Sequence, residues 1–295
     1  MTKFSPSTLV HPYAPACVLR VAGPDAPTFL QSQFTNDLSN ISPGQAVYGL
    51  WLDRKGRVLA DSHIVRDVAS DAFWVVSITS DGSAVARHLE DHIIADEVSV
   101  SNETGLWRGI ALVGPGTGEW FRTKPRPGFA FPGRRTAGES WEWIFPAKEL
   151  VPAAGAASAG RAADRADIER LRIEALIPSV PADIGPGDLP NEGGLDRLAI
   201  SYSKGCYTGQ EVMARVKSLG RVRRALVRVR GDGAPPPLPA ALWLGDKREG
   251  QLRSAERDAS GYAGLALVSV AGAREGALLA LAQNAEPTVT IDRLP

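Results

Sequence analysis

The pattern that most constrains the fold lies in the first hundred residues, where short apolar runs alternate with amphipathic stretches. Runs typical of strands cover residues 17–21, 46–52, 58–65 and 73–78. Leu30, Phe34 and Leu38, spaced four residues apart, mark one face of a helix, and Asp81 can cap a second helix. This order predicts an α+β sandwich with helices on one face of an antiparallel sheet.

The remaining sequence divides into two further parts. Residues 107–145 repeat the strand pattern more weakly, residues 164–174 are predicted to be helical, and four prolines between residues 178 and 190 force irregular chain. After Gly220, short strands separated by turns indicate a small β-barrel. We therefore expect an α+β domain over residues 1–105, a second α+β domain over 106–220, separate from the first or interleaved with it, and a β-barrel over 221–295.

Composition narrows the class of protein. The 295 residues include 33 Lys plus Arg and 33 Asp plus Glu, so a net charge of zero argues against whole-surface attraction to nucleic acid or membrane. The longest uncharged apolar stretch, residues 261–273, is too short to cross a bilayer, and the first residues lack a signal-peptide core. We expect a cytoplasmic protein with no membrane contact.

Residues that bind metals are sparse. The two cysteines, Cys17 and Cys206, cannot build a disulfide framework or a cysteine-rich metal site. His88 and His92 have the spacing of metal ligands on a predicted helix, but no further His or Cys cluster supports them. We therefore expect no metal site.

The most informative stretch runs from residue 203 to residue 215. Thr208 and Glu211 have the spacing of a capping box, which predicts a helix that begins there and ends at Gly220. Cys206 then precedes a helix N-terminus, with Lys204 close by, and both positive charges favour the thiolate form. We expect Cys206 to be a working thiol that Lys204 tunes. The alternative is a small buried cysteine at a tight turn.

Residues 204–211, Lys-Gly-Cys-Tyr-Thr-Gly-Gln-Glu, resemble the signature of the YgfZ/CAF17 family, folate-binding relatives of the glycine-cleavage T-protein. Three further segments resemble the family in the same order: residues 29–38, which end in Thr-Asn-Asp-Leu, residues 49–61, and Leu-Arg-Ile-Glu at 171–174. The T-protein has phenylalanine and isoleucine where this chain has Cys206 and Tyr207. At these two positions the chain therefore resembles the YgfZ proteins rather than the T-protein.

The resemblance implies a T-protein-like, three-lobed arrangement, with ferredoxin-like α+β parts followed by a small C-terminal β-barrel, around a cavity for tetrahydrofolate or another reduced folate. It implies that Glu174 binds the amino edge of the pterin, to which a carboxylate offers two charge-assisted hydrogen bonds. The site residues we expect are Cys206 and Lys204 as catalytic groups, and Glu174, Asn36, Asp37 and Tyr207 as groups that bind the cofactor.

Each of these assignments has a structural alternative. Glu174 can pair with Arg170 or Arg172 at a helix end. Asn36 and Asp37 can form a helix C-terminus and the turn that follows it.

A run of basic residues follows the cysteine motif. Against one acid, Glu211, residues 204–230 contain eight cations: Lys204, Arg215, Lys217, Arg221, Arg223, Arg224, Arg228 and Arg230. Such a region can bind RNA phosphates, the polyglutamate tail of a folate or an acidic partner protein. Aromatic residues for base stacking are almost absent from it. The alternative is a solvated helix face followed by the exposed side of a strand.

These features support three functions. The first, which the resemblance implies and which we favour, is a folate-binding accessory factor of the YgfZ type for assembly or repair of iron–sulfur proteins; in bacteria this family is linked to tRNA modification through an iron–sulfur methylthiotransferase. The second is a tetrahydrofolate-dependent aminomethyl or one-carbon transferase. The third is an RNA-binding module that uses the basic run over residues 215–230.

Overall fold

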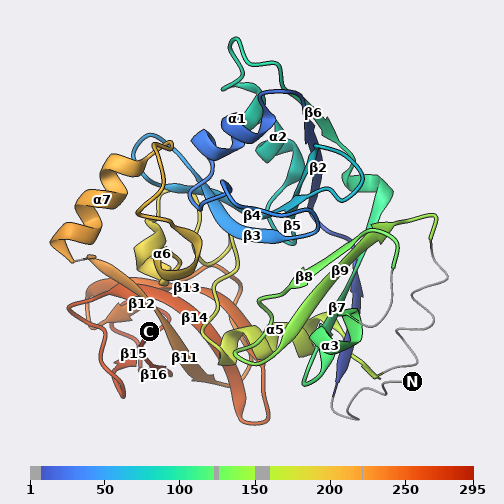
Figure 1. The fold of residues 1–295 in the computed structure, drawn as a ribbon. Coiled ribbons are helices and arrows are strands. Elements are labelled where there is room, and N and C mark those ends of the chain that lie inside the picture. Colours follow the sequence, from blue (N-terminus) through green and yellow to red (C-terminus); the bar gives the residue numbers. More distant parts are fainter. Residues whose placement is uncertain (1–7, 123–125, 150–159, 221) are drawn as a thin grey trace.

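Three β-sheets organise the molecule into three lobes around a common centre (Figure 1). The computed structural model describes residues 8–122, 126–149, 160–220 and 222–295. Within these ranges, no helix is both long and apolar enough to span a bilayer.

The first lobe confirms the predicted α+β sandwich. Its antiparallel sheet has the order β3-β4-β5-β2-β6. The strands are β2 (Cys17–Ala22), β3 (Ala46–Leu52), β4 (Val58–Arg66), β5 (Phe73–Ser77) and β6 (Ser99–Asn102). The helices α1 (Ala26–Gln33) and α2 (Gly82–Glu90) cover one face, where Leu19, Leu30 and Trp51 are fully buried. Asp81 caps α2, because its side chain accepts a hydrogen bond from the Ala84 N–H at 2.8 Å.

Helix α1 is shorter than the sequence pattern predicts. It ends at Gln33, so Phe34 and Leu38 do not extend its face. The cause is tertiary: the Lys204 ammonium bonds to the Gln31 and Phe34 carbonyls, and the Thr35 N–H donates to Leu50 O in β3.

The second lobe combines distant parts of the chain. Its sheet has the order β10-β1-β7-β9-β8, and β1 runs antiparallel to β7. The strands are β1 (Leu9–Tyr13), β7 (Trp107–Val113), β8 (Phe129–Pro132), β9 (Ser140–Pro146) and β10 (Arg161–Ala162), with a 3₁₀ turn η1 (Thr104–Leu106) before β7. Because β1 precedes the whole first sheet in sequence, the two sheets interleave. The domain boundaries at residues 105 and 220 remain predictions.

Two helices accompany this sheet. α3 (Thr117–Arg122) packs on β9, and α5 (Arg165–Glu174) runs from the second lobe to the barrel strands β13 and β14. Asp164 and Asp167 form a capping box at the start of α5, as expected for a helix that begins there.

A proline-containing connection follows α5 and packs between the first lobe and the barrel. It holds the short turns η2 (Pro190–Gly193) and α6 (Asp196–Ala199), followed by α7 (Gln210–Leu219). A shared apolar core includes Leu50 from β3, Ile184 from the connection, Met213 from α7 and Leu265 from the barrel. The connection therefore fixes the two lobes against each other.

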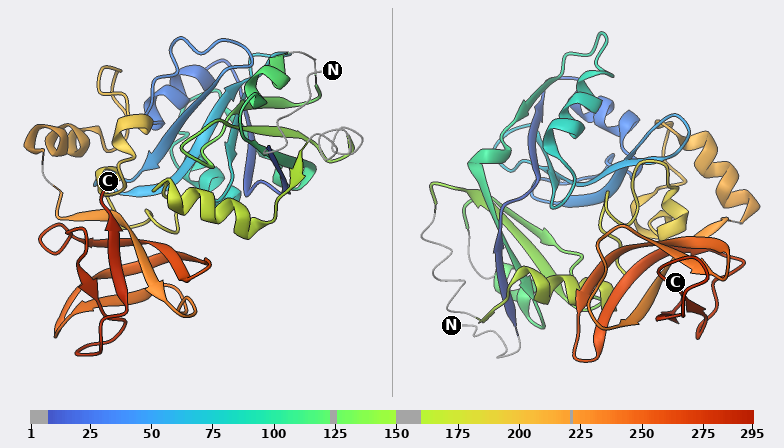
Figure 2. Two further views of the ribbon diagram at one scale, coloured as in Figure 1. Left: turned by 90° about the horizontal axis from the view of Figure 1, so that it is seen from below. Right: turned by 180° about the vertical axis from the view of Figure 1, so that it is seen from behind.

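The C-terminal lobe is the predicted small β-barrel (Figure 2). Its order is β12-β13-β14-β11-β16-β15, and a bridge between Trp243 and Ala280 brings the two edges together. The strands are β11 (Arg224–Asp232), β12 (Ala240–Leu244), β13 (Lys247–Arg257), β14 (Gly261–Ser269), β15 (Leu278–Leu279) and β16 (Val289–Arg293). Side chains such as Val229, Leu252 and Ile291 fill its interior completely.

Candidate functional site

The three lobes enclose a central cavity made of two adjoining hollows. The larger has a volume of about 470 Å³ and is bounded by β1, the end of β5, α5 and β13. A volume of this size lies within the range of about 300–1,000 Å³ that is typical of small-molecule sites. The residues that line both hollows are Ile78, Thr79, Arg135, Glu169, Arg172 and Ser179. The two hollows therefore adjoin each other, and every lobe contributes to their walls.

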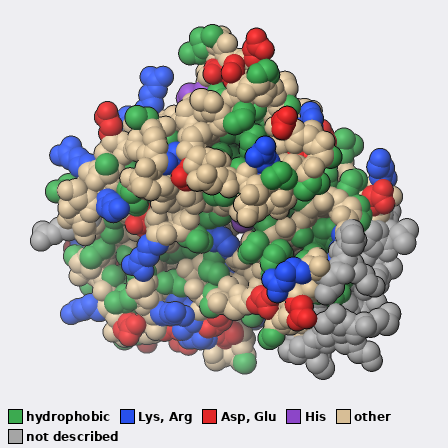
Figure 3. Space-filling view, in the orientation of Figure 1, with side chains coloured by type: hydrophobic (Ala, Val, Ile, Leu, Met, Phe, Trp, Pro, Cys, Tyr) green, Lys and Arg blue, Asp and Glu red, His purple; other side chains and the backbone are tan. Residues whose placement is uncertain are grey.

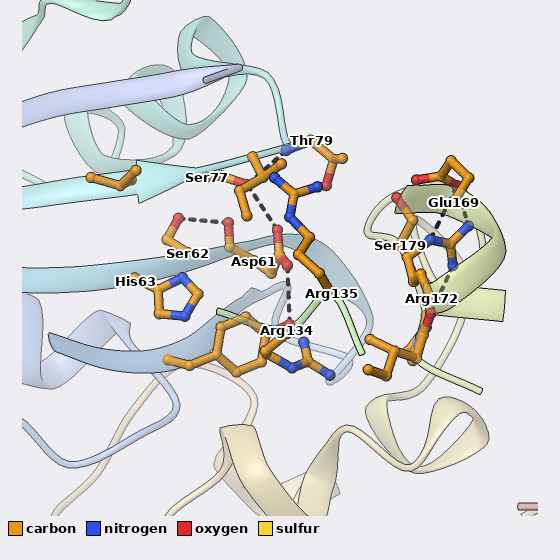
Figure 4. A pocket seen from close by; sticks show the side chains of 15 residues that line it. Asp61, Ser62, His63, Ser77, Thr79, Arg134, Arg135, Glu169, Arg172 and Ser179 are labelled. Carbon is orange, nitrogen blue, oxygen red and sulfur yellow. Dashed lines mark hydrogen bonds and ion pairs between the residues drawn. The ribbon is translucent and has the colours of Figure 1, made fainter. Parts of the chain in front are cut away.

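A carboxylate from the first lobe lies in the smaller hollow (Figure 4). Asp61 Oδ1 accepts hydrogen bonds from Ser77 Oγ at 2.9 Å and Ser80 Oγ at 2.8 Å, and Oδ2 accepts one from the Tyr48 hydroxyl at 3.0 Å. Burial, and then the nearby Asp61 charge, raise the pKa of Tyr48 well above its usual value. The carboxylate is therefore oriented by three neutral hydroxyl groups.

The second lobe contributes a buried ion pair behind the cavity wall. Arg135 Nε donates to Glu142 Oε1 at 2.6 Å, and the Tyr13 hydroxyl donates to Glu142 Oε2 at 2.6 Å. Burial opposes the charge of Arg135, but Glu142 outweighs it and raises the arginine pKa. Glu142 is completely buried, so this pair holds the Arg135 side chain in a fixed position.

Helix α5 presents one acid, Glu169, and two arginines, Arg165 and Arg172, to the cavity. Arg172 donates to Asp183 Oδ2 at 2.6 Å, to Glu169 Oε2 at 2.6 Å and to Ser254 Oγ at 2.9 Å. This guanidinium links α5, the connection and the barrel in one buried network. Within the described residues, the second oxygen of Glu169, Oε1, has no hydrogen-bond donor in the protein. It is the free acceptor of the network.

Two cations on the cavity wall lack a carboxylate partner within the described ranges. Arg134 lies over the Tyr48 ring, with Cζ 4.1 Å from the ring centroid, and Arg165 opens onto the larger hollow. His63 lines the smaller hollow, where burial and then Arg134 and Arg135 lower its pKa to about 3. His63 is therefore neutral at physiological pH, and the unpaired positive charge belongs to the arginines.

Glu174, the carboxylate expected to bind the cofactor, does not line either hollow. Its two oxygens accept hydrogen bonds from Arg228 at 2.6 Å and Arg230 at 2.9 Å, both on β11. The sequence alternatives, Arg170 and Arg172, pair instead with Asp167, and with Asp183 and Glu169. Glu174 is five residues beyond Glu169, about 140° around the helix, so the two side chains leave α5 on different sides.

Lys204 anchors the cysteine motif from inside the protein. Its Nζ donates to three backbone carbonyls, those of Gln31 at 2.6 Å, Phe34 at 2.6 Å and Asn36 at 3.1 Å. Burial lowers the pKa of Lys204 to about 8, and Asp37 opposes this shift. The lysine thus fastens the loop before α7 to the end of α1.

Cys206 is exposed on this loop, so the alternative of a buried, inert cysteine is wrong for this residue. The predicted capping box is also wrong. Helix α7 begins at Gln210 after Gly209, whose φ of 84° is left-handed, and Gly209 provides no side-chain cap. Thr208 instead donates its hydroxyl to Gln33 Oε1 at 3.0 Å. A tertiary contact has replaced the local one.

Asn36, Asp37 and Tyr207 gather around the same end of α1. Asn36 Nδ2 donates to Tyr48 O at 2.9 Å and Leu198 O at 3.1 Å, and Asp37 accepts from Gln31 and Ser39. The hydrogen bonds from Ser39 lower the pKa of Asp37, while burial raises that of Tyr207. None of the three lines the central cavity. The structure groups them with Lys204 and apart from Glu174.

The basic residues of this run fall into two groups, those that pair with carboxylates and those that are exposed. Arg224 pairs with Glu192 and Asp188, while Arg228 and Arg230 pair with Glu174 and Asp292. Carboxylates of the protein therefore offset the charge of these three arginines. Arg215, Lys217 and Arg223 are exposed, and Arg221 lies outside the described residues.

Several cavity residues were not anticipated from the sequence: Tyr13, Asp61, Arg134, Arg135 and Glu169. Asp61 lies at the end of the hairpin segment that resembles the family, and Glu169 shares a helix with Glu174, so a weak local signal existed for both. Arg134 and Arg135 lie in a loop with no pattern that predicts a site.

Comparisons with known proteins agree with this architecture. The profile of the GCVT N-terminal domain matches residues 17–123. The crystal structure of the glycine cleavage system aminomethyltransferase T from Bartonella henselae superposes with a TM-score of 0.79 at 19% identity, over 98% of this chain and 86% of that one. This likeness confirms the predicted T-protein-like fold.

Full-length relatives are similar in sequence. The chain is 29% identical to the tRNA-modifying protein YgfZ of Edwardsiella ictaluri, over 94% of this chain and 89% of the relative. It is 31% identical to the human mitochondrial iron–sulfur cluster assembly factor IBA57, over 92% of this chain and 84% of the relative. The similarity therefore covers all three lobes.

Proposed function

Because the chain belongs to the YgfZ/CAF17 family, which is related to the T-protein, we propose that it is a folate-binding accessory factor for iron–sulfur proteins in the cytoplasm. Its relatives are named for tRNA modification and for iron–sulfur cluster assembly. The observation that carries the proposal is the central cavity, which combines a free carboxylate oxygen, aromatic rings and unpaired arginines. Its clients would include an iron–sulfur enzyme that modifies tRNA.

The cavity residues fit a reduced folate. Glu169 Oε1 is a free acceptor for the aminopyrimidine edge of a pterin. The stacked rings of His11 and Tyr13, 6.2 Å apart, form an aromatic wall on the larger hollow. Arg134 and Arg165 can pair with the carboxylates of the glutamyl tail. Once bound, a reduced folate supplies one-carbon carrier chemistry at this position.

The exposed thiol supports the accessory role. Cys206 lies on the loop that Lys204 fastens to α1, and it does not line the cavity. We assign it to contact with a client protein, where the thiol can reach a cluster or a cysteine of the partner. Aminomethyl transfer, the alternative, draws support from the fold alone, and the fold does not specify the reaction.

Calorimetric titration with tetrahydrofolate tests the cavity with a matched pair of variants. Glu169→Gln and Glu174→Gln remove the same charge from the same helix, five residues apart. We expect Glu169→Gln to weaken binding about tenfold or more, since a charge-assisted hydrogen bond contributes roughly 1.5–3 kcal/mol, and Glu174→Gln to leave binding unchanged. The reverse ranking would contradict the cavity assignment and support the sequence-based role of Glu174.

Complementation of a deletion strain tests the accessory role. The readouts are the activity of an iron–sulfur enzyme and the level of methylthiolated tRNA. We expect the wild type to restore both, and Cys206→Ser to fail in both while it still binds tetrahydrofolate. Full rescue by Cys206→Ser would remove the thiol from the mechanism. Turnover of an aminomethyl donor by the purified protein would favour the transferase.

A further inference from the structure

Six basic residues on α7 and on the segments next to it form what we call the basic rim: Arg54, Lys55, Arg57, Arg215, Lys217 and Arg223. All but Arg57 are exposed. Within the described part of the chain, none forms an ion pair with a carboxylate, in contrast to Arg224, Arg228 and Arg230. The rim therefore consists of the cations in this region whose charge no carboxylate of the described chain neutralises.

The segments that carry the rim form one surface. A Cβ at Gly56 would lie 2.9 Å from Met213 Cε and 3.0 Å from Val212 Cβ, so the β3–β4 turn rests directly on α7. Arg57 donates to Gly187 O at 2.8 Å and lines the same hollow as Arg223, at the start of the barrel. Turn, helix and barrel edge are thus neighbours.

Two acids line the hollow that Arg57 and Arg223 share, but Glu192 pairs with Arg224 and Glu249 with Lys247, so few acids offset the charge of the rim. On the same segments, Asp53 accepts the backbone N–H groups of Lys55 and Arg57, each at 2.8 Å, and Glu211 lies in the first turn of α7. In Figure 3, basic side chains are spread over the flank that α7 forms in Figure 1. In a chain of zero net charge, this is a local rather than a global positive field.

We propose that the basic rim is a docking surface for an acidic patch on a partner protein. Leu219, at the end of α7, is 63% exposed among these cations, and an apolar anchor within a charged border is typical of protein interfaces. RNA is less suited, because the nearby aromatic rings are unavailable for stacking: Tyr207 is buried, and the Lys217 ammonium lies 3.9 Å from the centroid of the Tyr202 ring.

The inference rests on the proposed function only in taking the partner to be an iron–sulfur client. Its test needs neither folate nor a client. Cys206 serves as the reporter: it is exposed, and Gly209, three residues later, packs on the β3–β4 turn, with its Cβ position 2.8 Å from Asp53 O. Cys17, the other cysteine, is fully buried and does not compete.

The probes are two short cysteine peptides, one flanked by glutamates and one by lysines, each activated as a mixed disulfide with thionitrobenzoate. The Cys206 thiolate attacks the peptide sulfur, a protein–peptide disulfide forms, and thionitrobenzoate leaves with the electron pair of the broken S–S bond. Its absorbance gives the rate on the full-length protein.

We expect the acidic peptide to react at least about fivefold faster than the basic peptide at low salt, and the preference to vanish near 1 M salt, where the Debye length is about 3 Å. The combined change Arg54→Glu, Lys55→Glu and Arg215→Glu should reverse the preference. The control, Arg87→Glu, Arg108→Glu and Lys148→Glu, places the same charge change on exposed residues of the first two lobes and should preserve it.

Equal rates for the two peptides in the wild type, or an unchanged preference in the rim variant, would overturn the proposal. Bulk tRNA provides a further test as a competitor. If tRNA protects Cys206 only when the rim is intact, and the acidic peptide shows no preference, the partner of the rim is RNA and not a protein.

Discussion

The central cavity and the Cys206 loop are stabilised in opposite ways. In the cavity, side chains hold each other: Arg172 joins Glu169 and Asp183, and Arg135 joins Glu142. In the loop, Lys204 holds three backbone carbonyls and Thr208 bonds to Gln33, while the Cys206 thiol remains exposed. The cavity wall is therefore held by ion pairs, and the loop presents an exposed thiol that its anchoring contacts do not involve. Substitutions should separate the two roles.

The largest effect is expected at the buried network of α5. Arg172→Met leaves the Asp183 carboxylate, which is completely buried, without its cation. Breaking one side of a buried pair costs about 3–5 kcal/mol, so the free energy of unfolding should fall by that amount in urea titrations. Arg170→Met, on the same helix, removes a half-exposed partner of Asp167 and should cost less than about 1 kcal/mol. Similar losses in both would contradict the account of a buried network.

A smaller loss is expected at the loop. Lys204→Met deprives three carbonyls of their donor, and an unsatisfied buried polar group costs about 1–3 kcal/mol. Amide exchange over residues 200–209 should accelerate while exchange in the barrel strands stays the same. Wild-type exchange rates in this loop would show that Lys204 does not anchor it.

The same lysine predicts a pH dependence. Burial lowers the pKa of Lys204 to about 8 in the folded state, against an ordinary value of 10.5. Between these values the unfolded chain binds more protons than the folded one, so the contribution of Lys204 to stability rises with pH. The difference in unfolding free energy between wild type and Lys204→Met should therefore be larger at pH 9.5 than at about pH 7.5. A flat difference would show that the buried amine keeps its ordinary pKa, and a falling difference would show that its pKa is raised.

The smallest change in stability is expected for Cys206→Ser. The side chain is exposed, and surface substitutions of this kind change the free energy of unfolding by less than about 0.5 kcal/mol. If Cys206→Ser fails to complement while its urea unfolding is unchanged, the thiol is needed for function and not for the stability of the loop. A loss above 1 kcal/mol would mean that the sulfur is part of the packing.

Local patterns predicted the fold better than the site. Strands such as β3 and β4, the cap at Asp81 and the C-terminal barrel follow from neighbouring residues. The cavity does not, because Asp61, Arg134 and Glu169 meet only through tertiary packing. Spacing alone does not show which side of α5 faces the ligand.

The basic run shows the same limit. Sequence counts cations but not the carboxylates that fold against them, so Arg228 and Arg230 seemed available while Asp292 and Glu174 already neutralise them. The capping box failed for a related reason, since Thr208 bonds to Gln33 of a distant helix.

Hydrogen exchange with and without tetrahydrofolate tests the separation of cavity and loop most directly. We predict that the ligand slows exchange over residues 76–80, 133–136 and 165–179, the segments that contain cavity-lining residues, and leaves residues 203–210 unchanged. Protection concentrated at residues 203–210, with none at the cavity segments, would contradict the account.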